Sequence, residues 1–227
     1  MLKKIFASLL VIGAMSMLTA GTTFALLTSQ TSNAKGTVAT GTLTLSNKVN
    51  AATACLSYGG PASPANVNNA CDALFTSATL AYPGVASTVN VTILNNGTLN
   101  SSDLSLYMPT CTKVSTPGAP TPGGADPCAT GGALFTVAEA TSSAFTPGTA
   151  ACKFPAVSAS PCTFAAADSL NTFFTSYGTP GGAFDLGSGP AAGASRYFII
   201  SMELPSTASN SLQGQAAQFG LTWHITS

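Results

Sequence analysis

Apolar and polar residues alternate one by one along several stretches of this chain, and this alternation constrains the fold more than any other feature of the sequence. The clearest stretch lies near the C-terminus, where Phe219, Leu221, Trp223 and Ile225 are separated by small or polar residues such as His224. Successive side chains of a β-strand point to opposite faces, so a period of two is typical of a strand that is buried on one face. We therefore expect a strand here, with His224 facing outward.

The same alternation recurs at residues 42–45, 89–93, 104–108 and 198–204. Asn95, Asn96 and Gly97 follow the second of these stretches and form a strong turn signal, and Pro109 ends the third. Short strands at this spacing, separated by Gly/Pro-rich connections, predict an all-β fold. We expect a jelly-roll-like, two-sheet β-sandwich with one short inserted helix.

That helix is predicted by the one stretch with helical spacing. Its apolar residues recur at intervals of three and four, at Leu170, Phe173, Phe174 and Tyr177. Asp168 is a candidate N-cap and Gly178 a candidate stop. The helix either covers one end of the sandwich or presents a docking face to a partner.

The cysteine pattern predicts disulfides. The six cysteines are Cys55, Cys71, Cys111, Cys128, Cys152 and Cys162. An even number in an exported chain indicates three disulfides formed in an oxidising compartment. We favour the sequential pairing, because each consecutive pair brackets a Pro/Gly/Ala-rich stretch. A zinc site is the alternative, but no two cysteines have C-x-x-C spacing and the chain has a single histidine.

The N-terminus has the features of a removable export signal. Lys3 and Lys4 precede an apolar run over residues 5–18, and small residues then flank a cut between Ala25 and Leu26. We expect residues 1–25 to be a signal peptide cleaved at that bond. The rest would be secreted to the extracellular space or cell surface, with no stable membrane anchor after cleavage.

The charge balance argues against a nucleic-acid partner. Without Lys3 and Lys4, five basic residues face seven acidic ones, so the mature surface has no attraction for nucleic acid or anionic lipid. Only 6% of residues are charged, against about a quarter in ordinary soluble domains. Such a surface tolerates self-association.

Three blocks in a fixed order resemble the TasA/camelysin family of exported bacterial proteins, whose members form biofilm-matrix fibres. The first block is residues 21–25, followed by the Gly-Thr-Leu-Thr-Leu stretch at 41–45. The second runs from residue 80 to 99, with Pro83-Gly84 before a strand and Asn-Asn-Gly-Thr-Leu after it. The third comprises 197–204 and 217–225, with a turn between them. This chain departs from the family in its many cysteines, its few charges and its middle part, residues 111–161.

The resemblance implies a subunit that is cut by a dedicated signal peptidase and then polymerises head-to-tail with copies of itself. In this interpretation residues 26–37 form an extended segment and residues 38–227 a single β-sandwich domain. Leu27 is the first apolar anchor of the donated strand, and the alternative is an exported N-terminus with no role. The implied donor strand consists of Leu26, Leu27, Thr28, Ser29, Gln30, Thr31, Ser32, Asn33, Ala34 and Lys35.

Two other function classes remain as alternatives. Camelysin carries a reported metalloprotease activity, but here His224 is the only histidine and Glu139 and Glu203 are the only glutamates. We therefore expect no enzyme, and no catalytic, cofactor-binding or metal-binding residue. A surface- or carbohydrate-binding module is the third class. Its candidate stacking residues are Tyr82, Tyr107 and Tyr177.

Overall fold

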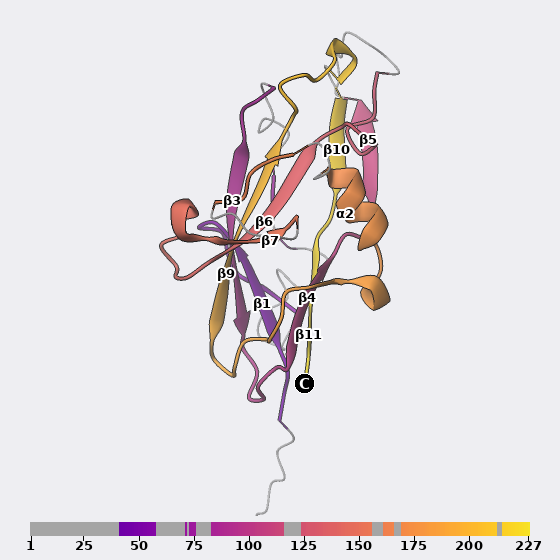
Figure 1. Cartoon of the computed structure of the whole chain (residues 1–227). Helices are drawn as coiled ribbons and strands as arrows, with labels where there is room; N and C mark the ends of the chain where they lie inside the picture. Colours follow the sequence, from indigo (N-terminus) through magenta and orange to yellow (C-terminus); the bar gives the residue numbers. More distant parts are fainter. Residues whose placement is uncertain are drawn as a thin grey trace, which may run out of the picture. The chain divides into compact units, whose positions relative to one another are not determined.

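Antiparallel strands make up most of the regular structure in the computed structural model (Figure 1). The structure describes residues 41–57, 71, 73–75, 83–115, 124–155, 161–165, 169–212 and 215–227. These residues contain eleven strands, one α-helix and three short 3-10 helices, and residues 41–227 form one compact unit. The signal peptide, the Ala25–Leu26 bond and the donor segment lie outside the described residues.

The first layer is a six-stranded antiparallel sheet with the strand order β2-β1-β3-β9-β6-β7. Its strands are β1 (Leu45–Val49), β2 (Cys55–Leu56), β3 (Ser87–Asn95), β6 (Leu134–Ala140), β7 (Ala151–Phe154) and β9 (Ser195–Glu203). The long central strands β3 and β9 pair from Ser87↔Met202 to Leu94↔Ser195. The ends of the sheet are short, since β2 has two residues and β7 has four.

The second layer consists of two short sheets, β10-β5 and β11-β4-β8. Its strands are β4 (Asp103–Tyr107), β5 (Cys111–Ser115), β8 (Phe184–Asp185), β10 (Gln215–Phe219) and β11 (Thr222–Thr226). Because β5 follows β4 and β11 follows β10, the two sheets form one long antiparallel pair with a break in the middle. Pro109 lies in this break, where it has no N–H to give to the ladder.

The core lies between the two layers and contains the side chains that the alternation places inward. It takes alternate residues from β3 and β9 in one layer and from β4 and β11 in the other. From these strands it includes Val89, Val91, Ile93, Leu104, Leu106, Phe198, Ile200, Met202 and Trp223. Two antiparallel layers around one apolar core make this an all-β sandwich. The jelly-roll connectivity stays a prediction.

Helix α2 (Leu170–Ser176) covers part of this core. Leu170 and Phe173 are fully buried, which confirms the covering role of the predicted helix. The predicted cap is wrong: Ser169, not Asp168, is the N-cap, because its hydroxyl accepts a hydrogen bond from the Thr172 amide at 3.1 Å. The 3-10 helices are Pro147–Thr149, Pro180–Gly182 and Asn210–Leu212.

The first predicted strand starts later than its alternation suggests. Strand β1 begins at Leu45, and the carbonyls of Thr42 and Thr44 instead accept hydrogen bonds from the turn that follows β3. The Thr98 amide donates to the Thr42 carbonyl at 2.8 Å and the Asn96 amide to the Thr44 carbonyl at 2.7 Å. Gly97 is required here, because a Cβ at that position would collide with the Thr42 carbonyl oxygen.

Candidate functional site

Three disulfides fix the loops of the domain. They join Cys55 to Cys71, Cys111 to Cys128 and Cys152 to Cys162, which is the sequential pairing favoured above.

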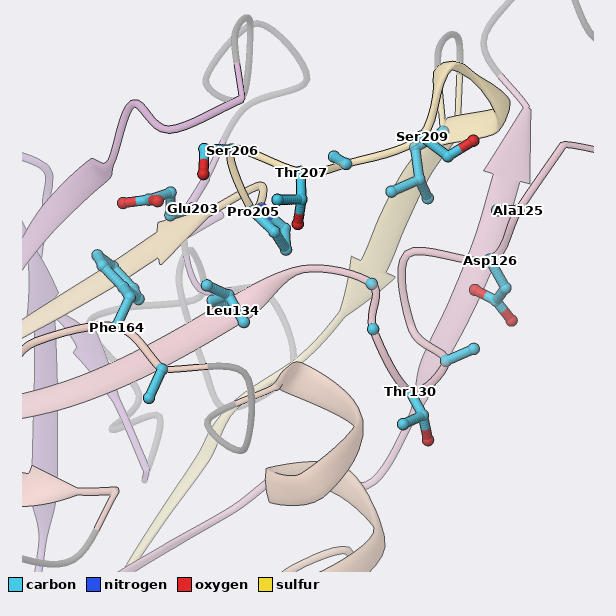
Figure 2. Close-up of a pocket in the computed structure, with 16 residues that line it drawn as sticks. Ala125, Asp126, Thr130, Leu134, Phe164, Glu203, Pro205, Ser206, Thr207 and Ser209 are labelled. Carbon is cyan, nitrogen blue, oxygen red and sulfur yellow. The ribbon is translucent and has the colours of Figure 1, made fainter.

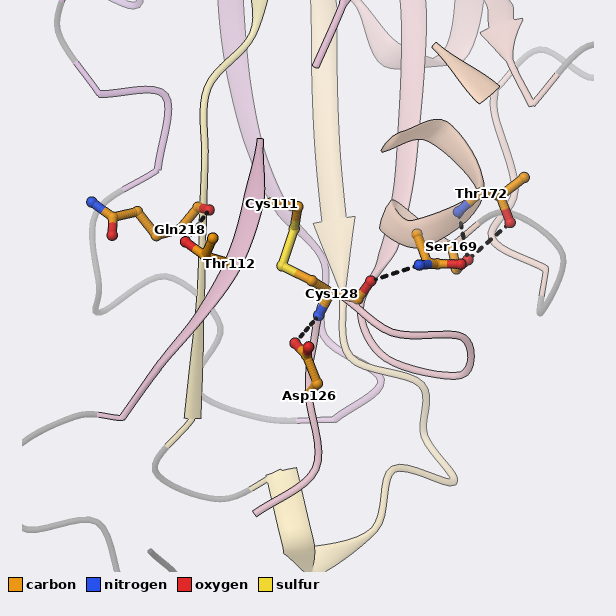
Figure 3. Close-up of a disulfide and its surroundings, with 8 residues drawn as sticks. Cys111, Thr112, Asp126, Cys128, Ser169, Thr172 and Gln218 are labelled. Atoms are coloured by element: carbon orange, nitrogen blue, oxygen red, sulfur yellow. Dashed lines mark hydrogen bonds between the residues drawn. A yellow bond between two sulfur atoms is a disulfide. The ribbon is translucent and has the colours of Figure 1, made fainter. Parts of the chain in front are cut away.

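The Cys111–Cys128 disulfide ties β5 to the loop that precedes β6 (Figure 3). The Cys128 amide also donates to the Asp126 carboxylate at 2.8 Å, and the Asn171 side chain in α2 donates to the Cys128 carbonyl at 3.0 Å. The disulfide thus links the second layer, the loop and the helix.

One edge of the larger sheet is closed by several local features. Strand β7 pairs with β6 through a bulge between Val137 and Ala138. Pro155 follows the strand directly, and the Cys152–Cys162 disulfide bridges back to it. Bulges, prolines and very short strands are the devices by which proteins stop an edge from pairing with another chain.

A half-buried ion cluster holds the same side of the molecule together. Glu139 on β6 receives two hydrogen bonds from Arg196, at 2.7 and 2.8 Å, and the Lys153 ammonium of β7 lies 2.9 Å from its carboxylate. Arg196 also donates to the Leu186 and Ser188 carbonyls, which follow β8 in the other layer. Burial alone would raise the pKa of Glu139, but the hydrogen bonds and charges of Arg196 and Lys153 outweigh burial and lower it.

The opposite side of the sandwich has an open edge. Strand β11 pairs with β4 on one side, and within the residues that the structure describes no strand pairs with its other side. His224 is exposed on this strand, next to Ser105 in the register, as the alternation predicts.

A groove of about 340 Å³ lies between this edge and the β1–β2 end of the larger sheet. From the larger sheet Leu45, Asn47 and Leu56 line it, and from the second layer Phe219 and Trp223 line it. The residues after Cys71 contribute to the lining as well. The groove is therefore a cleft of mixed polar and apolar lining between the two layers, beside a strand edge that pairs with no other described strand.

Two buried polar atoms of this groove have no hydrogen-bond partner among the described residues. They are the indole Nε1 of Trp223 and the Oδ1 of Asn47. The indole N–H only donates and the amide oxygen only accepts. Leaving such an atom buried and unpaired costs about 1–3 kcal/mol. Native proteins contain few of these groups, so two in one groove make it a candidate site.

A second pocket, of about 540 Å³, lies between the loop before β6 and the loop after β9 (Figure 2). Leu134 and Phe164 form its apolar part, and the loop after β9 supplies the hydroxyls of Thr207 and Ser209. Its two carboxylates, Asp126 and Glu203, lie at opposite ends of the pocket in Figure 2. No set of three or more His, Cys, Asp or Glu residues in the described ranges is grouped to hold a metal ion.

The other residues considered from sequence have structural positions. Tyr177 packs in an aromatic cluster, with its ring centroid 4.9 Å from that of Phe184. Tyr107 is half-buried on β4, and Tyr82 lies outside the described residues. Asn47 was not identified from sequence, although it continues the inward face of Leu43 and Leu45, where an amide side chain is unusual.

Comparison of the sequence with protein-family models and with curated proteins finds no match. The described part of the chain has no helix that is long and apolar enough to cross a membrane.

Proposed function

We propose that this protein is a structural subunit of an extracellular filament of the biofilm-matrix type, in which residues 26–35 of one subunit add as a strand to the next. The observation that carries the proposal is the open β11 edge beside the groove. An unpaired edge offers a row of N–H and C=O groups that an extended peptide can satisfy. The resemblance to the TasA/camelysin family supports the same assignment.

The lengths of donor and acceptor agree. Ten extended residues reach roughly 33 Å at about 3.3 Å per residue. The β10–β11 edge runs from Gln215 to Phe219 and from Thr222 to Thr226, a comparable length of strand. Most donor residues are Ser, Thr, Asn or Gln. Backbone hydrogen bonds would therefore supply much of the affinity, as in other cases of strand addition.

The contrast between the open β11 edge and the protected β7 edge favours a linear polymer. A subunit that donates its N-terminus and accepts at a different surface makes a heterologous contact. Such a contact does not close on itself unless the rotation between subunits happens to form a ring, so it generates a filament. The closed β7 edge would suppress side-by-side pairing between filaments.

Cleavage after Ala25 would act as the switch for assembly. Before the cut, the donor segment remains joined to the apolar signal at residues 5–18 and cannot reach a neighbouring subunit. After the cut, Leu26 becomes the free end of an extended segment. The three disulfides agree with an oxidising destination outside the cytoplasm.

Electron microscopy of the mature chain, beginning at Leu26, tests the proposal. We expect filaments from this protein and monomers from the chain that lacks residues 26–35. Circular dichroism and peptide mapping of the three disulfides check that the shortened chain is folded. A mature chain that stays monomeric, and that shows metal-dependent proteolysis lost in His224→Ala, would instead establish the protease alternative.

A further inference from the structure

The turn after β3 carries the only Asn-Gly sequence of the chain, Asn96-Gly97. We infer that Asn96 is a site of spontaneous deamidation, and that the buried side chain of Asn95 holds the reaction back in the folded protein. The inference concerns the chemical lifetime of the protein, and it holds whether or not the subunits form filaments. It follows from the hydrogen bonds that fix this turn.

The reaction joins the backbone nitrogen of Gly97 to the side-chain carbonyl carbon of Asn96. The new C–N bond closes a succinimide ring, and the side-chain nitrogen of Asn96 leaves as ammonia with the proton that the Gly97 nitrogen gives up. Water then opens the ring at either carbonyl, which leaves an aspartate or an isoaspartate at position 96. A glycine on the C-terminal side favours ring closure, because it has no Cβ to restrict the backbone. Asn96 is exposed, so water reaches its side chain.

Asn95 is fully buried, and both ends of its side-chain amide hold the turn. Its Oδ1 accepts a hydrogen bond from the Gly97 amide at 3.0 Å, so the nitrogen that would attack Asn96 is already engaged. Its Nδ2 donates to the Leu99 carbonyl at 2.8 Å and to the Pro190 carbonyl at 3.0 Å. Asn95 thus ties the attacking nitrogen to the far side of the turn and to the loop between β8 and β9.

The backbone on either side of the reactive bond is also fixed. The Asn96 amide donates to the Thr44 carbonyl at 2.7 Å, and the Thr98 amide donates to the Thr42 carbonyl at 2.8 Å. Gly97 lies so close to the Thr42 carbonyl oxygen that a Cβ at this position would collide with it. Ring closure requires rotation about the Cα–C bond of Asn96 until the Gly97 nitrogen meets the side chain. Because that rotation would break these hydrogen bonds, the reaction requires local opening of the turn.

Deamidation would weaken the same turn permanently. It places a carboxylate on the turn, and the isoaspartate form also adds a carbon atom to the backbone. The Thr42 and Thr44 carbonyls, which precede β1, would then no longer align with their amide donors. Asn95 therefore protects the point at which the chain enters the larger sheet.

Peptide mapping by mass spectrometry, during incubation in mildly alkaline buffer, measures the reaction at Asn96. The first comparison is between the folded, disulfide-bonded protein and the reduced chain in denaturant. We expect the folded protein to react at least about tenfold more slowly, because only the opened turn can form the ring. Amide hydrogen exchange should also show that the Gly97 N–H is protected in the folded protein. Equal deamidation rates, or an unprotected Gly97 N–H, would overturn the inference.

The second comparison uses Asn95→Ala, with Ser169→Ala as the control. Asn95→Ala frees the Gly97 amide and should speed the reaction roughly tenfold, the factor that corresponds to one or two lost hydrogen bonds. Ser169→Ala removes the N-cap of α2 and leaves the turn intact. It should change the rate little, because the turn opens without unfolding of the whole domain. An unchanged rate in folded Asn95→Ala, or an equal acceleration in Ser169→Ala, would contradict the role of Asn95. If Asn95→Ala does not fold, the first comparison and the exchange measurement still decide the question.

Discussion

The β7 edge of the larger sheet and the β11 edge of the second layer are built in opposite ways. Around β7 the chain places a bulge, a disulfide, a proline and a three-residue ion cluster. Around β11 the described residues place a groove and two unpaired polar atoms. A protein selected only to stay monomeric would protect both edges. The proposed function assigns the second edge to pairing with another subunit, and each prediction below alters one side of this comparison.

The largest expected effect follows from opening the closed edge. Replacing both Cys152 and Cys162 with Ala removes a disulfide between residues ten positions apart in the sequence. Because the unfolded chain then gains freedom, the free energy of unfolding should fall by about 3 kcal/mol. Denaturant titration measures this loss. We also expect thickened or laterally associated assemblies by electron microscopy, because β7 then becomes available for pairing.

The matched control removes Cys55–Cys71, the disulfide on the open side, which has a separation of 16 residues. It should cost a similar free energy without causing lateral association. Lateral association to the same extent in both double variants would contradict the distinction between the two edges.

The second effect concerns the ion cluster that ties β7 to its neighbours. Glu139→Gln should lower the free energy of unfolding by about 2 kcal/mol, since it weakens hydrogen bonds from the partly buried guanidinium of Arg196. Lys153→Met removes only the more exposed partner and should cost well under 1 kcal/mol. Thermal unfolding of both variants compares the two losses of stability. Equal losses in Glu139→Gln and Lys153→Met would show that Arg196 is not the principal partner of Glu139.

The pH dependence of the same cluster has a definite sign. The folded pKa of Glu139 is below its ordinary value of 4.5, so its contribution to stability is complete above that value. The contribution is lost as the pH falls through the lower, folded pKa. The stability difference between the wild type and Glu139→Gln should therefore shrink on acidification below about pH 4.5. A difference that grows on acidification would contradict the lowered pKa.

A smaller effect concerns the helix that supports β7 from inside. Phe173 of α2 packs against Phe154 of β7 with ring centres 4.9 Å apart. Ser169→Ala removes the N-cap and should cost about 1 kcal/mol. Asp168→Ala should cost much less, because Ser169 is the residue that makes the cap bond. Chemical denaturation of the two variants checks this, and the reverse order would restore Asp168 as the cap.

The strands that could be predicted from the sequence are buried differently from the strand that could not. Strands β3, β4 and β11 each have one inward face, so their residues alternate and could be predicted. The inward residues Phe198, Ile200 and Met202 of β9 could be predicted as well, although Ile199 between them belongs to a second buried cluster. Strand β6 is buried on both faces: Phe135 and Val137 face the main core, while Ala138 and Ala140 belong to a second cluster. A strand with two buried faces has no period of two, and the stretch from Leu134 to Ala140 therefore gave no strand signal.

The candidate site was predictable only in part. The alternation predicts Trp223 inward and His224 outward, and both predictions are confirmed. The open edge could not be predicted, because it depends on which strands become neighbours. That choice is made by contacts between distant parts of the chain, such as β3 with β9. The placement of an unpaired indole N–H and an unpaired amide oxygen in the lining of one groove depends on the same long-range contacts.

The smallest expected change has the opposite sign and tests the open side directly. Asn47→Leu replaces an unpaired buried oxygen with an apolar group of similar shape and should raise the stability of the unassembled subunit by about 1 kcal/mol. The same substitution should weaken assembly if the groove takes part in it, because it removes a polar group from the groove lining beside the β11 edge. Thermal unfolding of the monomer and sedimentation of the polymer measure the two effects separately. Ser46→Ala changes a buried residue on the other face of the same strand and should not weaken assembly. If Asn47→Leu destabilises the monomer, the oxygen already has a partner in the subunit, and the groove is part of an ordinary core. If it stabilises the monomer and impairs assembly, Asn47 costs the subunit stability in return for binding its neighbour.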